Sequence, residues 1–284
     1  MKAMIFAAAL FATPALACEP VIGAICADGE PLTEAAMIER LKGADIVILG
    51  ERHDNPAHHA TQAGLVATLA PGGLAFEMVP EAKSDAVNAA RAEGGDLAVV
   101  LDWANSGWPD WAMYEAIFDA APEAAVAGGG VPRDVLRRSI TEGAAKAMGA
   151  RGERYALNTR FDKETNADIL DEQDKAHCGA LPRGMLPGMA EAQQLRDAYF
   201  ADAALRLHEA GARPVVLITG NGHARVDRGV PLYLRRAAPE LTVVSVGQVE
   251  VPGGGSLPFD IEIFTEPFDR GDPCAKFIES RQKQ

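Results

Sequence analysis

The most constraining feature of this chain is the recurrence of short, largely apolar, β-branched segments that alternate with segments of helical character. Ala44–Gly50 (ADIVILG), Leu74–Val79 (LAFEMV) and Pro214–Thr219 (PVVLIT) are such segments. A helix is expected to follow the first of them, because Asn55 is a good cap and Pro56 a good first helical residue. Continuous apolar strands that alternate with helices predict a parallel sheet covered on both faces.

Further elements complete this pattern. A weaker strand at Ala124–Ala127 is expected to end at Gly128–Gly130, with a helix opening at Pro132. The regions 96–122 and 151–187 are predicted to form a helical insertion that caps the sheet. The expected fold class is therefore α/β, with a mostly parallel central sheet flanked by helices and a helical cap. The remaining predicted elements are helices at 56–69, 81–92, 132–148 and 189–210 and strands at 241–249 and 260–265.

The first residues predict a secretory signal peptide. Lys2 is the only charge before an apolar run from Ala3 to Leu16, and Ala15-Leu16-Ala17 has the small-x-small pattern of a signal peptidase site. The run is too short to span a bilayer as a helix. We therefore expect residues 1–17 to be removed, and the mature chain, residues 18–284, to be a single domain in the periplasm or outside the cell.

Four cysteines constrain the mature chain. Export permits disulfides, and of the three possible pairings we favour Cys18 with Cys26 and Cys178 with Cys274. Cys18 would also be the first mature residue, so the alternative is that it carries a lipid that anchors the protein to a membrane. Against this, Ala15 stands where a lipoprotein signal usually has Leu.

Charge and composition exclude several classes of partner. The formal net charge is -13, whereas nucleic acids and anionic lipid headgroups need a basic face. Hydrophobic residues make up 48% of the chain, which excludes a disordered protein. We expect a globular protein that does not bind nucleic acid.

The residues that can carry chemistry lie where the predicted strands end. The first strand runs into Gly50-Glu51-Arg52-His53, the second carries Glu77, and the fourth ends in Gly220-Asn221-Gly222-His223. Ligands of open parallel sheets bind outside the carboxyl ends of the strands, so these side chains should converge. Two imidazoles with carboxylates can bind Zn²⁺ or Mn²⁺, with His53, His223 and Glu51 as ligands, or act as acid and base around a water molecule. The spacing of these residues does not distinguish a metal site from an acid–base site.

Other residues have both functional and structural interpretations. His58 and His59 are adjacent on a predicted helix, so at most one can face the crevice and the other is expected at the surface. The aromatic cluster of three tryptophans and Tyr114 is either core packing or an apolar slot for a planar ligand. Arg196-Asp197 either reaches the site or forms a surface pair.

Five stretches of the chain carry a family resemblance: LGERHDNPAHHATQ (Leu49–Gln62), FEM (Phe76–Met78), WANSGWPDWAMY (Trp103–Tyr114), MLPGMAEAQQLRDAYFA (Met185–Ala201) and ITGNGHARVDRGVPLYL (Ile218–Leu234). In family order, they resemble the ChaN group of haem-binding iron-uptake proteins in the wider Tiki/TraB/erythromycin-esterase-like superfamily. One departure is that Gly130 stands where relatives are expected to have Asn, which removes a polar side chain from that loop.

The resemblance implies an exported protein that binds haem between two protomers as a face-to-face pair, with a tyrosine ligand to iron. Among Tyr114, Tyr155, Tyr199 and Tyr233 we choose Tyr114, because its tryptophan neighbours suit a porphyrin face. The other residues that we expect to contact haem are Trp108, Trp111, Met185, Met189 and His177.

In the enzymatic branches of the superfamily, two Gly-x-x-His motifs and a carboxylate form the active site. Carried over by position, this implies His53 and His223 with Glu51 and Glu77, while Arg196 matches the Arg of an Arg-Asp/Asn element. Two hypotheses follow. The first is an exported haem carrier for iron acquisition that dimerises around its ligand. The alternative is an esterase or peptidase that depends on these residues, with or without a metal.

Overall fold

The structure is a computed structural model that describes residues 17–252, 258–272 and 274–275. Residues 1–16 of the predicted signal peptide therefore lie outside the described residues. The strands are β1 Ile25–Ala27, β2 Glu30–Pro31, β3 Ile46–Glu51, β4 Gly73–Pro80, β5 Ala125–Gly130, β6 Val215–Gly220, β7 Val243–Glu250 and β8 Ile261–Thr265.

Helices connect the strands in the alternating order that the sequence predicts. The α-helices are α1 Glu34–Lys42, α2 Pro56–Leu69, α3 Ser84–Glu93, α4 Leu97–Leu101, α5 Trp111–Asp119, α6 Arg133–Glu142, α7 Ala144–Met148, α8 Lys163–Ala176, α9 Leu186–Glu209, α10 Asn221–Ala224 and α11 Val230–Ala237. Short 3₁₀ helices are η1 Glu81–Lys83, η2 Trp103–Asn105, η3 Gly149–Tyr155 and η4 Arg183–Met185.

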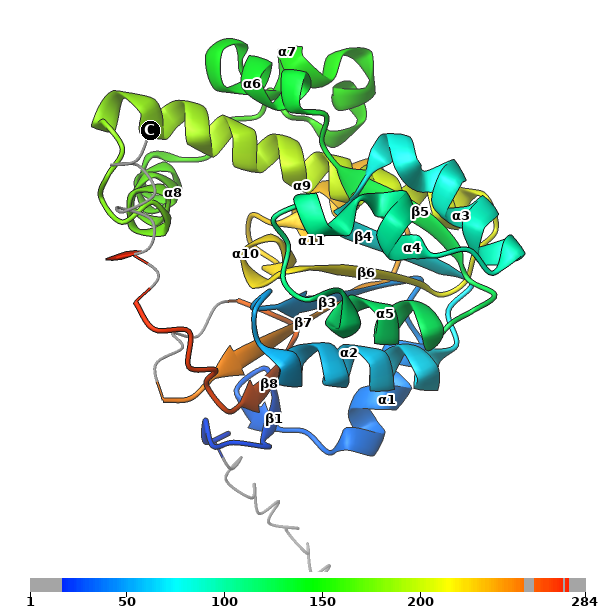
Figure 1. The fold of residues 1–284 in the computed structure, drawn as a ribbon. Helices are drawn as coiled ribbons and strands as arrows, with labels where there is room; N and C mark the ends of the chain where they lie inside the picture. The colour runs from blue at the N-terminus through cyan, green and yellow to red at the C-terminus, as the bar shows by residue number, and fades with distance from the viewer. Residues whose placement is uncertain (1–16, 253–257, 273, 276–284) are drawn as a thin grey trace, which may run out of the picture.

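The strands form one sheet in the order β2-β1-β8-β7-β3-β6-β4-β5 (Figure 1). The six strands from β8 to β5 run parallel, whereas β1 pairs antiparallel with both β8 and β2. The prediction of a mostly parallel sheet is confirmed. The order also places β6 between β3 and β4, so the strands that carry Glu51, Glu77 and the second Gly-x-x-His loop are neighbours.

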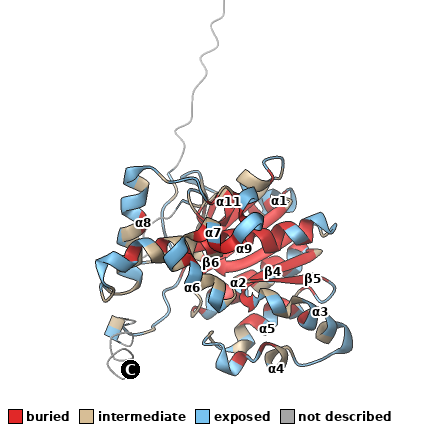
Figure 2. Ribbon diagram, turned by 90° about the horizontal axis from the view of Figure 1, so that it is seen from above, coloured by how far each residue is buried: buried red, intermediate tan, exposed pale blue. Residues whose placement is uncertain are grey.

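Both faces of the sheet are covered, and successive residues of a strand belong to different faces. On β3, Val47 and Leu49 pack in the core with α1, α2 and α5, whereas Ile46 and Ile48 pack with α9 and α11. This alternation is the period of two that an extended strand imposes. The strands are consequently buried between two helical layers (Figure 2), which explains their nearly continuous apolar sequence.

The three glycines expected to end the fifth strand instead lie within it. Gly128 to Gly130 are the last residues of β5, because β4 passes very close to this strand. A Cβ at Gly128 would lie 2.5 Å from the carbonyl oxygens of both Val79 and Pro80. The glycines therefore permit a close approach of two backbones, a use of glycine that sequence alone does not distinguish from a turn.

The helices follow the prediction with one interruption. Helix α2 begins at Pro56, and the side chain of Asn55 caps it by accepting a hydrogen bond from the Ala57 amide. The helix predicted over 132–148 is divided into α6 and α7, because Gly143 between them has a φ of 89°. No helix in the described part of the chain is long and apolar enough to cross a membrane.

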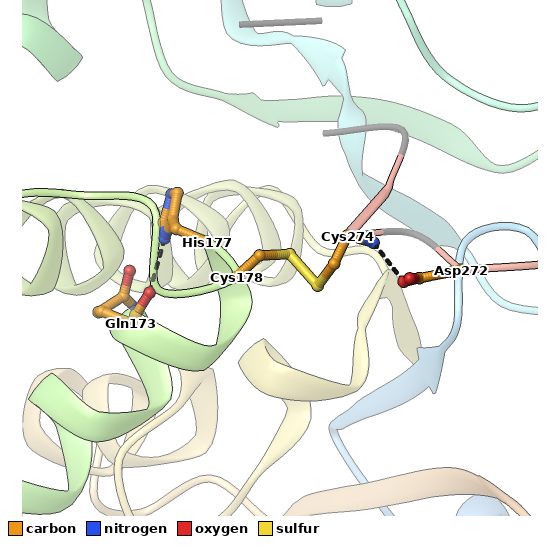
Figure 3. Close-up of a disulfide and its surroundings, with 5 residues drawn as sticks. All are labelled: Gln173, His177, Cys178, Asp272 and Cys274. Carbon is orange, nitrogen blue, oxygen red and sulfur yellow. Dashed lines mark hydrogen bonds between the residues drawn. A yellow bond between two sulfur atoms is a disulfide. The ribbon is translucent and has the colours of Figure 1, made fainter. Parts of the chain in front are cut away.

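Two disulfides form, with the pairing that the sequence analysis favours. Cys18 is bonded to Cys26, and Cys178, at the end of α8, is bonded to Cys274 near the C-terminus (Figure 3). Their sequence separations are 8 and 96 residues. The second disulfide links the helical insertion to the C-terminal segment. The Cys18–Cys26 disulfide occupies the Cys18 sulfur to which a lipid would be attached.

Candidate functional site

The carboxyl ends of β3, β4 and β6 bring the predicted site residues together around Glu77. This side chain is buried, and its Oε2 accepts hydrogen bonds from Thr219 Oγ1 at 2.7 Å and from the Gly220 amide at 2.8 Å. Its Oε1 lies 3.7 Å from His223 Nε2 and 3.9 Å from His53 Nε2. Burial acts to raise the pKa of Glu77, but the two imidazoles and the hydrogen bonds lower it below its ordinary value.

The first imidazole is held by a carboxylate of its own loop. A hydrogen bond of 2.8 Å joins His53 Nδ1 to Oε1 of Glu51, the last residue of β3. The side chain of His53 is 33% exposed, and its ring meets the Trp108 ring edge-on at 5.0 Å. Although burial lowers the pKa of His53, the charges of Glu77 and Glu51 raise it to about 9. His53 is therefore protonated at neutral pH.

The second imidazole is held by a carboxylate from a distant helix. A hydrogen bond of 2.7 Å joins His223 Nδ1 to Asp197 Oδ1 on α9, and the Gln193 amide nitrogen lies 3.1 Å from the same Nδ1. His223 is only 10% exposed. Burial opposes its charge, but Glu77 and Asp197 raise the pKa of His223. Burial also raises the pKa of Asp197 to about 6, against the effect of His223.

These five side chains form a row, Glu51–His53–Glu77–His223–Asp197, in which a carboxylate and an imidazole alternate. The sequence predicts four of its members, whereas for Asp197 it allows either a site residue or a surface partner. The only local signal for Asp197 is its position next to Arg196 on the long helix. A row of this kind can hold, donate and accept protons at the end of the sheet.

The divalent metal site predicted from His53, His223 and Glu51 is not supported. Within the described residues, no group of three His, Cys, Asp or Glu side chains is arranged to hold a metal ion. The reason lies at Glu51, whose Oε1 already accepts hydrogen bonds from His53 Nδ1 and from Tyr114 OH. The imidazole that should share a metal with this carboxylate is instead its hydrogen-bonding partner.

Beside the row lies a crevice of about 640 Å³, within the range of small-molecule sites. Glu77 and His223 line it, together with apolar side chains and two arginines. A hollow of about 700 Å³ between α7 and the segment 157–166 holds none of the predicted site residues. The remaining side chains of the crevice that bear on its chemistry are Met78, Trp108, Arg133, Leu136, Arg196 and Phe200.

Tyr114 does not face this crevice. It is fully buried, between the rings of His59 and Trp103, and its hydroxyl donates a 2.8 Å hydrogen bond to Glu51 Oε1. Burial and the charge of Glu51 raise the pKa of Tyr114, which disfavours the phenolate that binds ferric iron. The prediction of Tyr114 as iron ligand therefore does not fit this structure. Tyr155, Tyr199 and Tyr233 are buried as well.

The other residues expected to contact haem are mostly elsewhere. Trp108 lines the crevice, but none of the other four belongs to its described lining. Trp111 donates its Nε1–H to Glu115, and His177 caps α8, with its Nδ1 2.7 Å from Gln173 O (Figure 3). Met185 and Met189 lie at the start of α9, whereas the crevice lies beside the middle of this helix, two to three turns away.

His58 and His59 are both buried, contrary to the expectation of a surface position for one of them. His58 Nδ1 accepts a hydrogen bond from the Arg52 amide, and its Nε2 lies 2.8 Å from Thr265 Oγ1. Burial is the main reason that the pKa of His58 falls to about 4. His59 Nε2 lies 2.9 Å from the His53 carbonyl oxygen. The two side chains thus hold the loop that presents His53.

Comparisons with known proteins agree with this architecture. A family model described as haem-binding uptake, Tiki superfamily, ChaN matches residues 37–234. No curated protein matches the chain. A structure of ChaN of Campylobacter jejuni, described as showing cofacial haem binding, is 21% identical with a TM-score of 0.68, over 84% of this chain and 95% of that chain. At this identity the likeness establishes the fold alone.

Two further solved structures match more distantly. An erythromycin esterase in its open conformation is 13% identical with a TM-score of 0.41, over 86% of this chain and 82% of that chain. A type III effector is also 13% identical with a TM-score of 0.41, over 82% and 93% of the two chains. Similarity at this level carries no argument about function.

Proposed function

Because the chain belongs to the haem-binding uptake family of the ChaN type, in the Tiki superfamily, we propose that it binds haem in the crevice beside Glu77 and acts as an exported carrier in haem or iron acquisition. The observation that carries this proposal is the crevice itself. It lies at the carboxyl ends of parallel strands, has the volume of a small-molecule site, and has walls of Met78, Trp108 and Phe200 that suit an apolar, planar ligand.

The side chains around the crevice suit the apolar body of haem, but its described lining includes no tyrosine that could bind the iron. His53 is 33% exposed and its ring contacts Trp108, a residue of the crevice wall, and its Nε2 faces Glu77 Oε1 at 3.9 Å without a hydrogen bond. Its Nδ1 is held by Glu51 at 2.8 Å, and histidines that bind metals commonly have such a carboxylate behind them. We therefore assign His53, rather than Tyr114, to the iron; because the pKa of His53 is raised to about 9, the iron would have to displace the proton from its Nε2.

Haem titration of the mature protein, residues 18–284, tests both statements. Wild type is expected to give a saturable shift of the Soret band, Tyr114→Phe the same shift, and His53→Ala a weaker and spectrally different one. His177→Ala, which changes an imidazole outside the crevice, is the matched control. Absence of any shift in wild type would end the haem proposal. A Soret shift that is altered only in Tyr114→Phe would indicate that Tyr114 binds the iron.

Dimerisation on haem is part of this proposal. The family resemblance implies two haems face to face between two protomers. Elution volume during the same titration is expected to change from monomer to dimer as haem saturates. A monomer that stays monomeric with a full Soret shift would contradict this part alone.

Export is supported by the signal peptide pattern and by two disulfides, which persist in oxidising compartments. The Cys18–Cys26 disulfide favours an unlipidated mature protein in the periplasm. An intact-mass measurement on the exported protein should give residues 18–284 less the hydrogens lost on forming two disulfides. An added diacyl mass would instead show lipidation of Cys18 and anchoring to a membrane.

A second candidate function, a hydrolase, is favoured by one observation: the row of carboxylates and imidazoles exceeds what binding of haem requires. Since the pKa values of His53 and His223 are both raised, these imidazoles would donate protons or stabilise negative charge rather than act as bases. An esterase and peptidase screen of wild type, His53→Ala and His223→Ala tests this function. Equal rates in all three proteins would exclude it.

A further inference from the structure

Two guanidinium groups face the crevice without a counter-ion. Arg196 lies near the middle of α9, half-buried, and Arg133 is the exposed first residue of α6. Within the described residues, no carboxylate lies within 4.0 Å of either guanidinium. The chain has 40 Asp and Glu but only 27 Lys and Arg, so unpaired arginines are not explained by a shortage of acidic side chains.

The acidic side chains of the crevice are already neutralised. Glu77 lies between His53 and His223, as described above. Glu81 Oε1 is 2.8 Å from Arg151 and 3.3 Å from Arg206, which also pair with Asp202. The positive charges of Arg133 and Arg196 are therefore left over in a crevice that is otherwise apolar or internally paired.

The start of α6 adds to this excess. Helix α6 begins directly after β5, and Pro132 before it offers no side-chain cap for the first amides. The amino end of a helix carries a partial positive charge. This end lies at the crevice, whose lining includes Val131, Pro132 and Arg133. The crevice thus combines apolar side chains with two arginines that pair with no carboxylate of the described residues.

From this we infer that Arg133 and Arg196 form an anion subsite that binds the carboxylates of an amphiphilic ligand, which in the proposed function are the two propionates of haem. The inference rests on that function and deepens it. Arginine forms paired, charge-assisted hydrogen bonds with carboxylates, so the subsite orients the ligand as well as attracting it. Trp108, Phe200 and Met78 then contact the apolar body.

The test compares ligands that differ only at the carboxylates or at the iron. Hemin, hemin dimethyl ester and iron-free protoporphyrin IX are titrated into mature wild-type protein in one buffer with a mild detergent, by absorbance and by fluorescence quenching. Because a hydrogen bond to a charged group contributes about 1.5–3 kcal/mol, we expect the ester to bind roughly 10- to 100-fold more weakly than hemin. Protoporphyrin IX should keep the sensitivity to the arginines without any contribution from iron.

The same titrations on variants locate the subsite. Arg196→Gln and Arg133→Gln should each weaken hemin and protoporphyrin IX, and the double variant should bind hemin and its ester equally. Arg137→Gln is the matched control, because Arg137 is exposed on the same helix but does not line the crevice. Circular dichroism verifies that each variant is folded.

The outcomes separate the two proposals. Wild type that binds hemin and its ester with equal affinity, or arginine variants that bind hemin like wild type, would overturn the subsite and leave haem binding intact. Wild type that binds neither hemin nor protoporphyrin IX would overturn the proposed function, and the subsite with it. Discrimination against the ester that disappears only in the arginine variants would establish the subsite.

Discussion

The two Gly-x-x-His loops have the same spacing and follow neighbouring parallel strands, yet they differ in how their histidines are held. His53 is one-third exposed and is bound by Glu51, two residues before it. His223 is 10% exposed and is bound by Asp197, 26 residues before it on another element. The first loop is self-contained, whereas the second depends on α9.

The same Gly-x-x-His motif therefore holds its histidine in two different environments. The first loop holds its imidazole one-third exposed and edge-on to Trp108, a residue of the crevice wall, and His58 and His59 contact this loop. The second loop places its imidazole in the wall, where Phe200 and Asp197 enclose it. We therefore expect substitutions at the first loop to change ligand binding, and those at the second to change it much less.

The largest effect is expected where the two loops meet. Glu77→Gln removes the charge that both imidazoles face, and breaking a buried ion pair on one side typically costs about 3–5 kcal/mol. Urea denaturation should show a loss of this size, and NMR titration should show the pKa values of both His53 and His223 falling. If only one imidazole responds, the row is not a connected unit.

The next effect concerns His58, which lies beside the first loop. Its pKa is lowered, whereas the pKa of His53 is raised. The pKa of His58 is about 4 in the folded protein, compared with 6.5 when unfolded. Between these values the unfolded state binds more protons, so the stability from His58 is complete above pH 6.5 and is lost as the pH falls through this window. The loss should be about 3 kcal/mol.

Free energies of unfolding measured at pH 7, 5.5 and 4 check this prediction. In His58→Gln the part of the pH dependence due to this group should disappear. Glu250, whose pKa is lowered to about 2 from an ordinary value of 4.5, loses its contribution as the pH falls from 4.5 towards 2, so its window overlaps that of His58 only near pH 4. An unchanged profile in His58→Gln would mean that another group is responsible.

Matched substitutions of the two carboxylate partners test the difference between the two loops directly. Asp197→Asn and Glu51→Gln each remove the charge from one hydrogen bond to an imidazole, which should cost about 2 kcal/mol. Each variant should lower the pKa of its own histidine chiefly, that of His223 or His53 respectively, as measured by NMR. Haem affinity should fall in Glu51→Gln but change little in Asp197→Asn. The reverse order would contradict the assignment of His53 to the iron.

The smallest effect is expected for Tyr114→Phe. This substitution removes one hydrogen bond to Glu51 while the ring stays packed against His59 and Trp103, so the cost should be about 1 kcal/mol in thermal or urea unfolding. Tyr155→Phe, which removes a hydrogen bond to Asp202 in the opposite helical layer, is a suitable control. A loss well above this value would indicate that the phenol contributes more to the site than its single hydrogen bond.

The sequence predicts structure where the signal is local, and it does not where the structure depends on contacts between distant segments. The strands, the Asn55 cap and the two loops follow from apolar pattern and capping chemistry within a few residues. The role of Asp197, the burial of Tyr114 and the close packing at Gly128 all depend on segments that meet only in the folded chain. The aromatic neighbours of Tyr114 that suggest a porphyrin site in the sequence are its packing partners in the core.

By itself, the sequence determined the family, the parallel α/β fold and the gathering of Glu51, His53, Glu77 and His223 at one end of the sheet. The family follows from motifs that match in family order, whereas the fold and this gathering follow from hydrophobic periodicity and from the common direction of parallel strands. Only the tertiary structure decided which oxygen faces which nitrogen and which arginines remain unpaired. The physical reason is that burial and charge compensation depend on distances of a few ångströms between groups such as Glu77 and Thr219, which are 142 residues apart in the chain.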